Sequence, residues 1–156
     1  MYGTSTKTFD PNMNLTRGMV VTVLHRMHGA APTGEYKTPF PDVRDGVYYT
    51  DAVRWAAANG IVTGYENGLF GPDDLVTREQ LAAILYRYQQ FSGKKPASTH
   101  PAQMFADGDS ISPYAKEAVN MLVTQGVIGG KPGNLFDPKG NATRAEYAAM
   151  LHRLAN

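Results

Sequence analysis

The 156-residue sequence predicts a mostly α-helical fold built from helix-loop-helix repeats. Two observations predict it: one motif recurs three times with fixed internal spacing, and each copy runs into an amphipathic helical pattern. The motif is a Phe followed two residues later by Pro and seven residues later by Thr-Arg. Its copies are Phe9-Pro11-Thr16-Arg17, Phe70-Pro72-Thr77-Arg78 and Phe136-Pro138-Thr143-Arg144. Because such repetition marks stacked supersecondary units, we predict one repeat array and not independent lobes.

A helix is expected directly after each Thr-Arg pair, because apolar residues recur there at the spacing of a half-buried helix. Thr77 with Gln80 and Thr143 with Glu146 also have the spacing of a capping box, whereas the first copy has Met19 at the corresponding position. These helices therefore begin at the Thr-Arg pairs. The apolar stripes are Val20/Val23/Leu24/Met27, Leu81/Ile84/Leu85/Tyr88 and Tyr147/Met150/Leu151/Leu154.

A second helix is expected upstream of the motif in the second and third copies. Ser112-Pro113 has the pattern of an N-cap followed by Pro at the first helical position, and the helix is expected to run to Gly126. Thr50 to Asn59, closed by Gly60, is its counterpart. Turn-forming sequences at 64–68 and 130–134 connect these leading helices to the Phe-x-Pro segments. Each complete repeat is thus a helix, a glycine loop, a Phe-x-Pro segment and a second helix.

The register of the motifs defines two and a half repeats. Residues 1–31 form the second half of repeat one, 40–92 form repeat two and 105–156 form repeat three, with segments 29–39 and 92–104 as linkers. The equivalent of residues 40–61 is missing from the first copy, so a bundle in this register lacks one helix. We expect a second copy of the chain, as a homodimer or swapped partner, or a rearranged first repeat to fill that gap.

Composition excludes several partner classes. The formal net charge is +1 with no run of basic residues, which favours neither nucleic acid nor an anionic membrane as a partner. No stretch approaches the roughly 20 apolar residues of a membrane-spanning helix, so we expect no membrane insertion. Residues 3–7 do not resemble a signal peptide, and any export signal is expected upstream. The absence of Cys excludes disulfides and thiolate zinc sites, and decides little about compartment.

Catalytic and metal sites are not expected. His25 and His152 occupy equivalent helix positions, which marks them as surface residues of the repeat and not as general bases. His28 and His100 lack the spacing of metal ligands. The acidic pairs of the chain are too short for a calcium loop. We therefore predict a non-catalytic protein with no metal and no cofactor.

Arg17, Arg78 and Arg144 are the candidate ligand-binding residues. Each falls at a first helical position, where the helix dipole disfavours a cation by about 0.3–1 kcal/mol. A guanidinium beside free backbone N–H groups at a helix N-terminus supplies donors for a carboxylate or phosphate. Alternatively, each Arg forms a salt bridge with a neighbouring repeat, through Asp42 or Asp107. The residues alone leave both interpretations open.

The chain resembles the surface-layer homology repeats of bacterial cell-surface proteins. The resemblance covers nearly the whole chain outside the linkers, and it lies in Phe40-Pro41-Asp42, in Phe105-Ala106-Asp107, in the run from Ala52 to Tyr65 and in Thr77-Arg78-Glu79-Gln80. It implies a pseudo-threefold, mostly helical module that anchors exoproteins to a pyruvylated secondary cell-wall polysaccharide, and so an extracellular location in the cell wall or S-layer. It also implies that grooves between repeats are lined by Arg17, Arg78, Arg144, Gly3, Gly64 and Gly130.

Further site candidates follow from that resemblance. Trp55 is a candidate platform for the apolar face of a sugar, although core packing is the simpler role for a lone Trp on such a helix. Asp42 and Asp107 are candidates for binding sugar hydroxyls, or else ordinary turn residues. Of the three motif copies, Thr143-Arg144-Ala145-Glu146 matches the family segment in full.

Two functions are compatible with these residues. The first is a cell-wall polysaccharide anchor, and the second is a structural or protein-interaction array whose Arg residues pair internally. If every guanidinium were locked against a carboxylate of the same chain, with no open cleft beside it, the anchoring hypothesis would fail.

Overall fold

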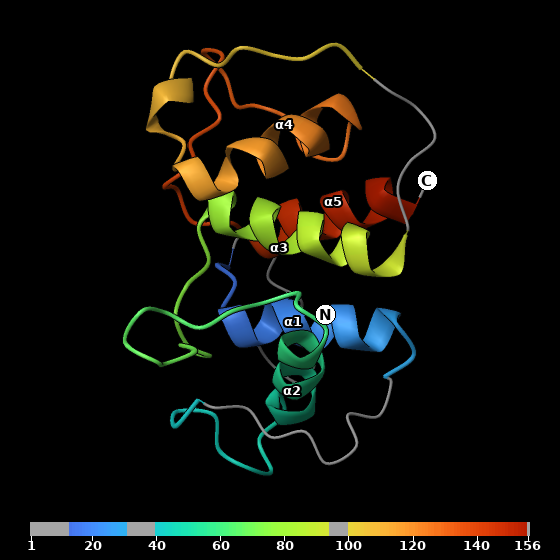
Figure 1. The fold of residues 1–156 in the computed structure, drawn as a ribbon. Coiled ribbons are helices and arrows are strands. Elements are labelled where there is room, and N and C mark those ends of the chain that lie inside the picture. The colour runs from blue at the N-terminus through green and yellow to red at the C-terminus, as the bar shows by residue number, and fades with distance from the viewer. Residues whose placement is uncertain (1–12, 31–39, 94–99, 156) are drawn as a thin grey trace. The chain divides into compact units, whose positions relative to one another are not determined.

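The structure is a computed structural model that describes residues 13–30, 40–93 and 100–155. Over these ranges the chain forms five α-helices and two short 3-10 helices, with isolated β-bridges and no strand (Figure 1). The predicted mostly α-helical repeat fold is confirmed. The α-helices are α1 (Arg17–Met27), α2 (Thr50–Ala58), α3 (Arg78–Ser92), α4 (Lys116–Thr124) and α5 (Arg144–Ala155), and the 3-10 helices are η1 (Gly108–Ser110) and η2 (Pro113–Ala115).

The described residues group into two compact units. One unit contains α1 and α2, and the other contains α3, α4 and α5 together with Met13 and Asn14. The division therefore falls within repeat two, between its leading helix and its second helix. The two compact units do not coincide with the three repeat segments. The repeat boundaries therefore remain a prediction from the sequence.

The second helix of each repeat begins at its Arg, as predicted. Thr77 and Gln80 form the full capping box at α3, with each side chain bonded to the other residue's backbone N–H. Thr143 and Glu146 exchange the same pair of bonds at α5, at 3.0 and 3.2 Å. Thr16 caps α1 through the N–H of Met19 at 3.1 Å, without a reciprocal bond. The motif therefore sets where these helices start.

The leading helix of repeat three differs from its prediction. It opens with the 3-10 turn η2 before α4, and the hydroxyl of Ser112 makes no capping bond. Instead, the N–H of Ser112 donates to Glu79 at 3.0 Å, which is a contact with another helix. The Ser112 hydroxyl accepts from Lys139 and not from the N–H groups of its own helix. The counterpart α2 ends at Ala58, with Gly60 just beyond it at φ +71° as expected of a helix stop.

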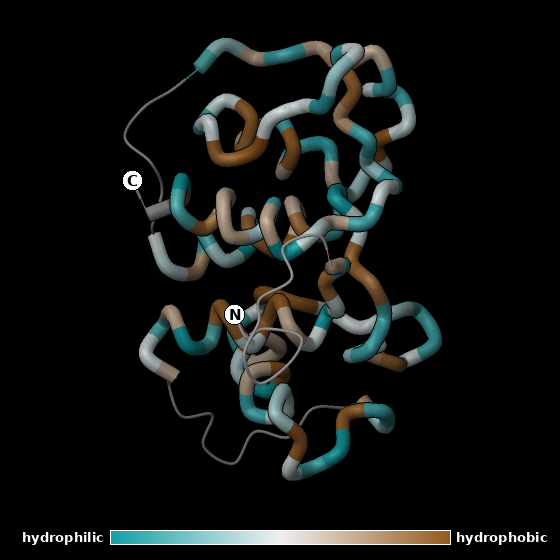
Figure 2. The backbone as a smooth tube through the Cα atoms, turned by 180° about the vertical axis from the view of Figure 1, so that it is seen from behind, coloured by the Kyte–Doolittle hydropathy of each residue, from teal (hydrophilic) through white to brown (hydrophobic). Residues whose placement is uncertain are grey.

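Each unit has its own buried core. Trp55, Phe70 and Leu24 are among the most buried side chains of the first unit, and Tyr88 and Tyr147 are among those of the second. Along the helices, hydrophobic residues alternate with hydrophilic ones (Figure 2), which is the pattern of half-buried helices. The predicted stripes are buried apart from Met27, which is exposed at the end of α1, and Leu151, which is half-buried.

Candidate functional site

The first backbone N–H groups of these helices are already bonded, contrary to the prediction that they are free. In α3 the N–H of Arg78 donates to Gly140 O at 2.8 Å and the N–H of Glu79 to Pro138 O at 3.0 Å. In α1 the N–H of Arg17 donates to Asp74 O at 2.9 Å. Backbone carbonyls in or just after a Phe-x-Pro segment thus accept the N–H groups that have no partner within the helix itself. Anion binding by these backbone groups is therefore not supported, and the guanidinium itself becomes the candidate.

Arg78 is held by three kinds of contact. Its Nε donates to Phe136 O at 2.7 Å and its Nη2 to Gly129 O at 2.9 Å. Its Nη1 forms an ion pair with Glu146, the capping-box residue of α5. The guanidinium carbon also lies 5.0 Å from the centre of the Phe136 ring. The residue is 3% exposed, so this cation has one fixed position.

Arg17 has the same carbonyl contacts in the first unit. Its Nε donates to Phe70 O at 2.8 Å and its Nη2 to Thr63 O at 3.0 Å. Thr63 and Phe70 are the sequence equivalents of Gly129 and Phe136. The guanidinium carbon lies 4.8 Å from the Tyr65 ring centre and 4.6 Å from that of Phe70. The motif Arg therefore reaches into the loop of the following repeat in both units.

Arg144, the third motif Arg, is also buried at the start of its helix. Arg144 is 5% exposed and its backbone N–H donates to Met13 O at 3.0 Å, the equivalent of the Arg78 bond to Gly140. Gly3, the glycine predicted to accompany it, lies outside the described residues.

The two described glycines of the predicted set are needed for packing. A Cβ at Gly130 would lie 2.7 Å from the Phe105 ring and 3.0 Å from Leu135 O. At Gly64 the same contacts fall on Phe40 at 2.5 Å and Leu69 O at 2.9 Å. Any larger residue would push away the aromatic ring of the Phe-x-Asp segment. The loop beside each Arg is therefore shaped by close aromatic contact.

A groove of about 410 Å³ opens beside Arg78. Its charged lining residues are three cations, Arg78, Lys131 and Arg153, and one anion, Glu146. Lys131 and Arg153 are exposed, and Lys131 also pairs with Asp137 at 2.6 Å. Neither residue is among the predicted ligand-binding residues, although an Arg recurs ten residues after each motif Thr, at Arg26, Arg87 and Arg153. The remaining lining residues are Ile128, Gly129, Gly130, Ala145, Ala149 and Met150.

The carboxylates of Asp42 and Asp107 accept hydrogen bonds from backbone N–H groups. Asp107 accepts the N–H groups of Phe136 and Asp137, both at 2.8 Å. Asp42 accepts those of Phe70 and Gly71 at 2.9 and 2.8 Å. Both oxygens of each carboxylate thus accept backbone N–H groups, and the ion pair of Arg78 is with Glu146. The Phe-x-Asp segment thus fixes the loop whose carbonyls receive the guanidinium.

The carboxyl of Asp107 is stabilised in its charged form. Burial raises the pKa of this group, but the N–H bonds from Phe136 and Asp137 and the charge of Arg78 together outweigh burial, and the pKa lies below its ordinary value. Stability from a depressed carboxyl pKa is complete above the unfolded-state pKa, near 4, and is lost as pH falls through the folded-state value.

Replacing Asp107 by Ala is expected to lower the free energy of unfolding by about 1.5–3 kcal/mol at pH 7, as for hydrogen bonds to a charged group. The loss should shrink as pH falls below about 4, because the unfolded-state carboxyl then takes up a proton while the native carboxyl, whose pKa is lower, does so only at still lower pH. Urea unfolding at pH 7 and at pH 3 measures both effects, with the exposed neighbour Asp109→Ala as control. Equal losses at the two pH values would contradict this role.

Trp55 lies in the core. Its side chain is 2% exposed, and its ring centre lies 5.2 Å from that of His25 and 5.5 Å from that of His28. This burial leaves no ring face for a sugar and favours core packing. His25 is itself buried, so its predicted surface position is wrong, whereas the equivalent His152 is exposed.

Glu79 forms a buried polar cluster that was not predicted from the sequence. It stands where the family segment has Ala and is 2% exposed. Its carboxylate accepts from Ser112 N at 3.0 Å, from Tyr114 OH at 3.1 Å and from Lys139 Nζ at 2.9 Å. Burial raises the pKa of Glu79, but these bonds outweigh it and hold the pKa below the ordinary value. The cluster therefore ties α3 to the start of the leading helix of repeat three.

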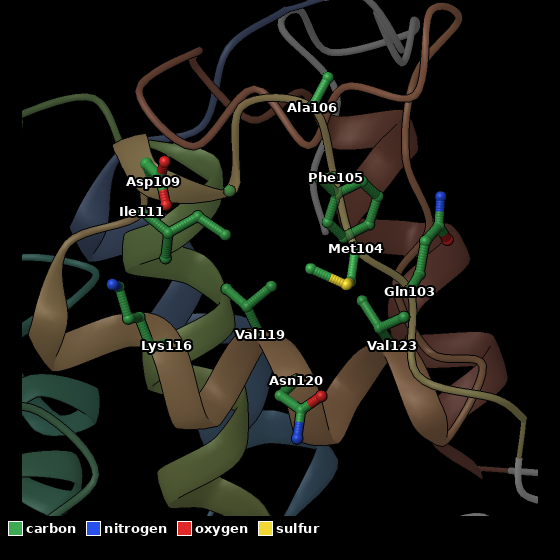
Figure 3. Close-up of a pocket in the computed structure, with 11 residues that line it drawn as sticks. Gln103, Met104, Phe105, Ala106, Asp109, Ile111, Lys116, Val119, Asn120 and Val123 are labelled. Atoms are coloured by element: carbon green, nitrogen blue, oxygen red, sulfur yellow. The ribbon is translucent and has the colours of Figure 1, made fainter.

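A second hollow, of about 370 Å³, lies between segment 103–106 and α4. Figure 3 shows Met104 and Phe105 on one side of it, with Val119 and Val123 rising from the helix on the other. Its lining is largely apolar, with Lys116 as its single cation. It therefore offers little to an anionic ligand, and the groove beside Arg78 is the better candidate.

Within the described ranges no group of three or more His, Asp or Glu side chains is arranged to hold a metal ion. None of the helices described is long and apolar enough to cross a membrane.

Helical repeats with a buried Arg set into the loop of the next repeat define a modular helical scaffold. The particular family follows from comparison: the S-layer homology domain matches residues 39–82 and 105–148, and the chain belongs to this family. It is a cell-surface anchoring module of the bacterial cell wall or S-layer. The domain itself is non-catalytic, although enzymes carry it as one part of a longer chain.

Relatives of the chain include both enzymes and surface proteins. It is 34% identical to an amylopullulanase of Thermoanaerobacterium thermosulfurigenes, over 94% of this chain and 8% of that protein. It is 27% identical to a cellulosome-anchoring protein of Acetivibrio thermocellus, over 93% of this chain and 33% of the relative. It is 27% identical to a surface-layer 125 kDa protein of Lysinibacillus sphaericus, over 97% of this chain and 12% of the relative. The chain thus spans a third or less of these relatives.

Proposed function

We propose that this chain anchors a larger protein to the bacterial cell wall by binding a pyruvylated secondary cell-wall polysaccharide in the groove beside Arg78. A ketal pyruvate places a carboxylate at the end of a neutral sugar. The observation that carries the proposal is the charge of the groove lining, with three cations against one anion. The catalytic or structural activity of the parent protein would lie elsewhere in its chain, as the enzyme relatives suggest.

The cations of the groove have different tasks in this proposal. Arg78 is buried and its guanidinium is fixed by two carbonyls. Its side chain is therefore already ordered in the free protein, and ligand binding costs no further side-chain entropy there. Lys131 and Arg153 are exposed and make the first contact with the carboxylate. Arg153 presents a planar fork that suits a carboxylate, whereas Lys131 acts as a point charge. Together they favour a mono-anionic sugar over a neutral one.

Glu146 weakens the attraction of the groove for an anionic sugar, because it pairs with Arg78. Its ion pair offsets part of the Arg78 charge, and Asp137 likewise pairs with Lys131, so the attraction for an anion is smaller than three isolated cations would give. Exposed charges are screened by salt within about 10 Å at 0.1 M. Binding is therefore expected to weaken as salt rises.

The internal ion pair also favours the second candidate, a structural array whose Arg residues serve stability alone. That function accounts for the contacts of Arg78 and Glu146. It does not account for exposed Lys131 and Arg153 on an open groove. The two functions therefore separate on whether the groove takes up an acidic glycan.

The test is retention of the chain on purified cell-wall glycan, before and after acid hydrolysis of the ketal pyruvate. We expect retention on the native glycan and at least tenfold weaker retention on the hydrolysed one. The double variant Lys131→Gln/Arg153→Gln should lose retention, while Lys116→Gln, an exposed cation outside the groove, should not. Equal retention on the two glycans would overturn the proposal in favour of the structural array.

A further inference from the structure

We propose that Asn67 is a modification site, at which the side-chain amide is converted to aspartyl and isoaspartyl products through a succinimide. The sequence contains two Asn-Gly pairs, Asn59-Gly60 and Asn67-Gly68, and each is followed by a branched aliphatic residue. An Asn-Gly pair favours this reaction because Gly has no Cβ to shield the attacking nitrogen and restricts the backbone least. The local sequences are nearly the same, so the structure decides which pair reacts.

The reaction consumes water and releases ammonia. The deprotonated backbone nitrogen of Gly68 attacks Cγ of Asn67 and forms the N–Cγ bond of the succinimide ring. The Cγ–Nδ2 bond breaks, and the amide nitrogen takes up a proton and leaves as ammonia. Water then opens the ring. Breaking the new N–Cγ bond gives an aspartyl residue, and breaking the original peptide bond gives an isoaspartyl residue, whose main chain runs through the former side chain.

The hydrogen bond of the Asn67 side chain favours the first step. Its Oδ1 accepts the N–H of Leu69 at 3.0 Å. This oxygen gains negative charge as the nitrogen attacks Cγ, and a backbone N–H already in place stabilises that charge. At Asn59 the bond falls on the other side-chain atom, because Nδ2 donates to Trp55 O at 2.8 Å. That bond ties the leaving nitrogen to α2 and holds the side chain away from the Gly60 nitrogen.

The backbone at Asn67 lies in an exposed turn. Residues 66–69 are all exposed, and the exposed fraction of Leu69 is 37%. The N–H of Gly68 donates to Tyr65 O at 3.0 Å, so this bond must open before the nitrogen can attack. Turn bonds at the surface open at a small fraction of the free energy of global unfolding. The attack therefore requires only a local opening of the turn.

The backbone at Asn59 is fixed by the end of α2, although Asn59 and Gly60 are also exposed. The N–H of Asn59 donates to Trp55 O at 3.2 Å, and the N–H of Ile61 donates to Ala56 O at 2.8 Å. Ile61 follows Gly60 directly and is fully buried. Rotation of the Gly60 backbone would displace this core residue and the last turn of the helix. Exposure alone therefore does not separate the two pairs, whereas the anchoring of their neighbours does.

The products at Asn67 would form in the loop that holds Arg17. Thr63 and Phe70, on either side of this turn, supply the carbonyls that accept from the guanidinium. Tyr65 of the same loop has its ring centre 4.8 Å from the guanidinium carbon. The isoaspartyl product lengthens the main chain between the two carbonyls, and both products add a carboxylate. The modification therefore changes the length and the charge of the loop around Arg17.

The matching loop of repeat three has no such pair. Gly133 and Asn134 stand there in the reverse order, and Asn134 is not followed by Gly. Both polar atoms of the Asn134 side chain are bonded, since Nδ2 donates to Met104 O and Oδ1 accepts from a Gln side chain, each at 2.8 Å. The loop beside the Arg78 groove is therefore expected to stay unmodified, and the proposed function does not depend on this inference.

Peptide mapping by mass spectrometry tests the inference, because exchange of the amide for a carboxyl raises the mass of the peptide. The chain is kept at mildly alkaline pH, either folded or unfolded in guanidinium chloride. In the folded chain we expect Asn67 to convert at least tenfold faster than Asn59. In the unfolded chain the two rates should agree within threefold, because the structural difference is gone. Asn67→Ala should abolish most of the conversion of the folded chain at Asn-Gly pairs, and the control Asn59→Ala should not.

Equal rates at the two pairs in the folded chain, or faster conversion of Asn59, would overturn the inference. A tenfold difference that persisted in guanidinium chloride would also overturn it, because the sequence and not the structure would then set the rates. Chromatography separates the isoaspartyl from the aspartyl peptide, and an aspartyl product alone would exclude the succinimide. None of these readouts involves a glycan, so the inference can fail while the proposed function holds.

Discussion

Replacing Arg78 by Met is expected to remove glycan retention and to destabilise the unit that contains it. The change deletes the ion pair with Glu146 and the bonds to Phe136 O and Gly129 O. Breaking a buried pair typically costs about 3–5 kcal/mol. The side chain of Glu146 is 24% exposed and can be partly solvated, so we expect the low end of that range. Chemical unfolding and glycan retention measure the two effects.

A matched double variant separates stability from binding. In Arg78→Met/Glu146→Gln no carboxylate is left unpaired, and Gln at this position keeps the capping box, as Gln80 does at α3. We expect much of the lost stability to return while glycan retention stays absent. If the folded double variant retained the glycan as well as the natural chain, Arg78 would be a structural residue alone.

Replacing Trp55 by Ala is expected to lower the free energy of unfolding by about 3–5 kcal/mol, because it empties a fully packed site against His25 and His28. Circular dichroism during urea unfolding measures the loss. His152→Ala changes the exposed equivalent of His25 and is expected to have little effect.

The milder variant Trp55→Phe distinguishes core packing from a sugar platform. It should fold and bind glycan with unchanged affinity, since the ring has no exposed face. Loss of glycan affinity in a variant of near-normal stability would restore the sugar-platform role.

The helix starts could be predicted because their causes are local. Thr77 and Gln80, three residues apart, carry the whole capping signal for α3 within one helical turn. The apolar stripes follow equally from short-range periodicity. Neither feature depends on what packs against the helix, so the motif sufficed.

The partners of the Arg residues could not be predicted, because they are remote in sequence. Arg78 meets Gly129, Phe136 and Glu146, and the Glu146 pair joins residues 68 positions apart. A first helical position suggested free N–H groups, yet a distant loop supplies carbonyls to them. The same reason explains Ser112, whose hydroxyl bonds Lys139 and whose N–H bonds Glu79, both remote in sequence. These contacts join residues that are far apart in the chain, and the local patterns of a single sequence do not show which distant residues meet.

Mapping of backbone amide shifts by NMR, with a pyruvylated fragment of the cell-wall glycan added to the chain, shows directly whether the groove beside Arg78 binds this glycan. We expect saturable shifts at Gly129, Gly130 and Arg153, and none of similar size around Lys116 and the hollow beside α4. Saturable shifts confined to residues outside the Arg78 groove, or none at all, would contradict it.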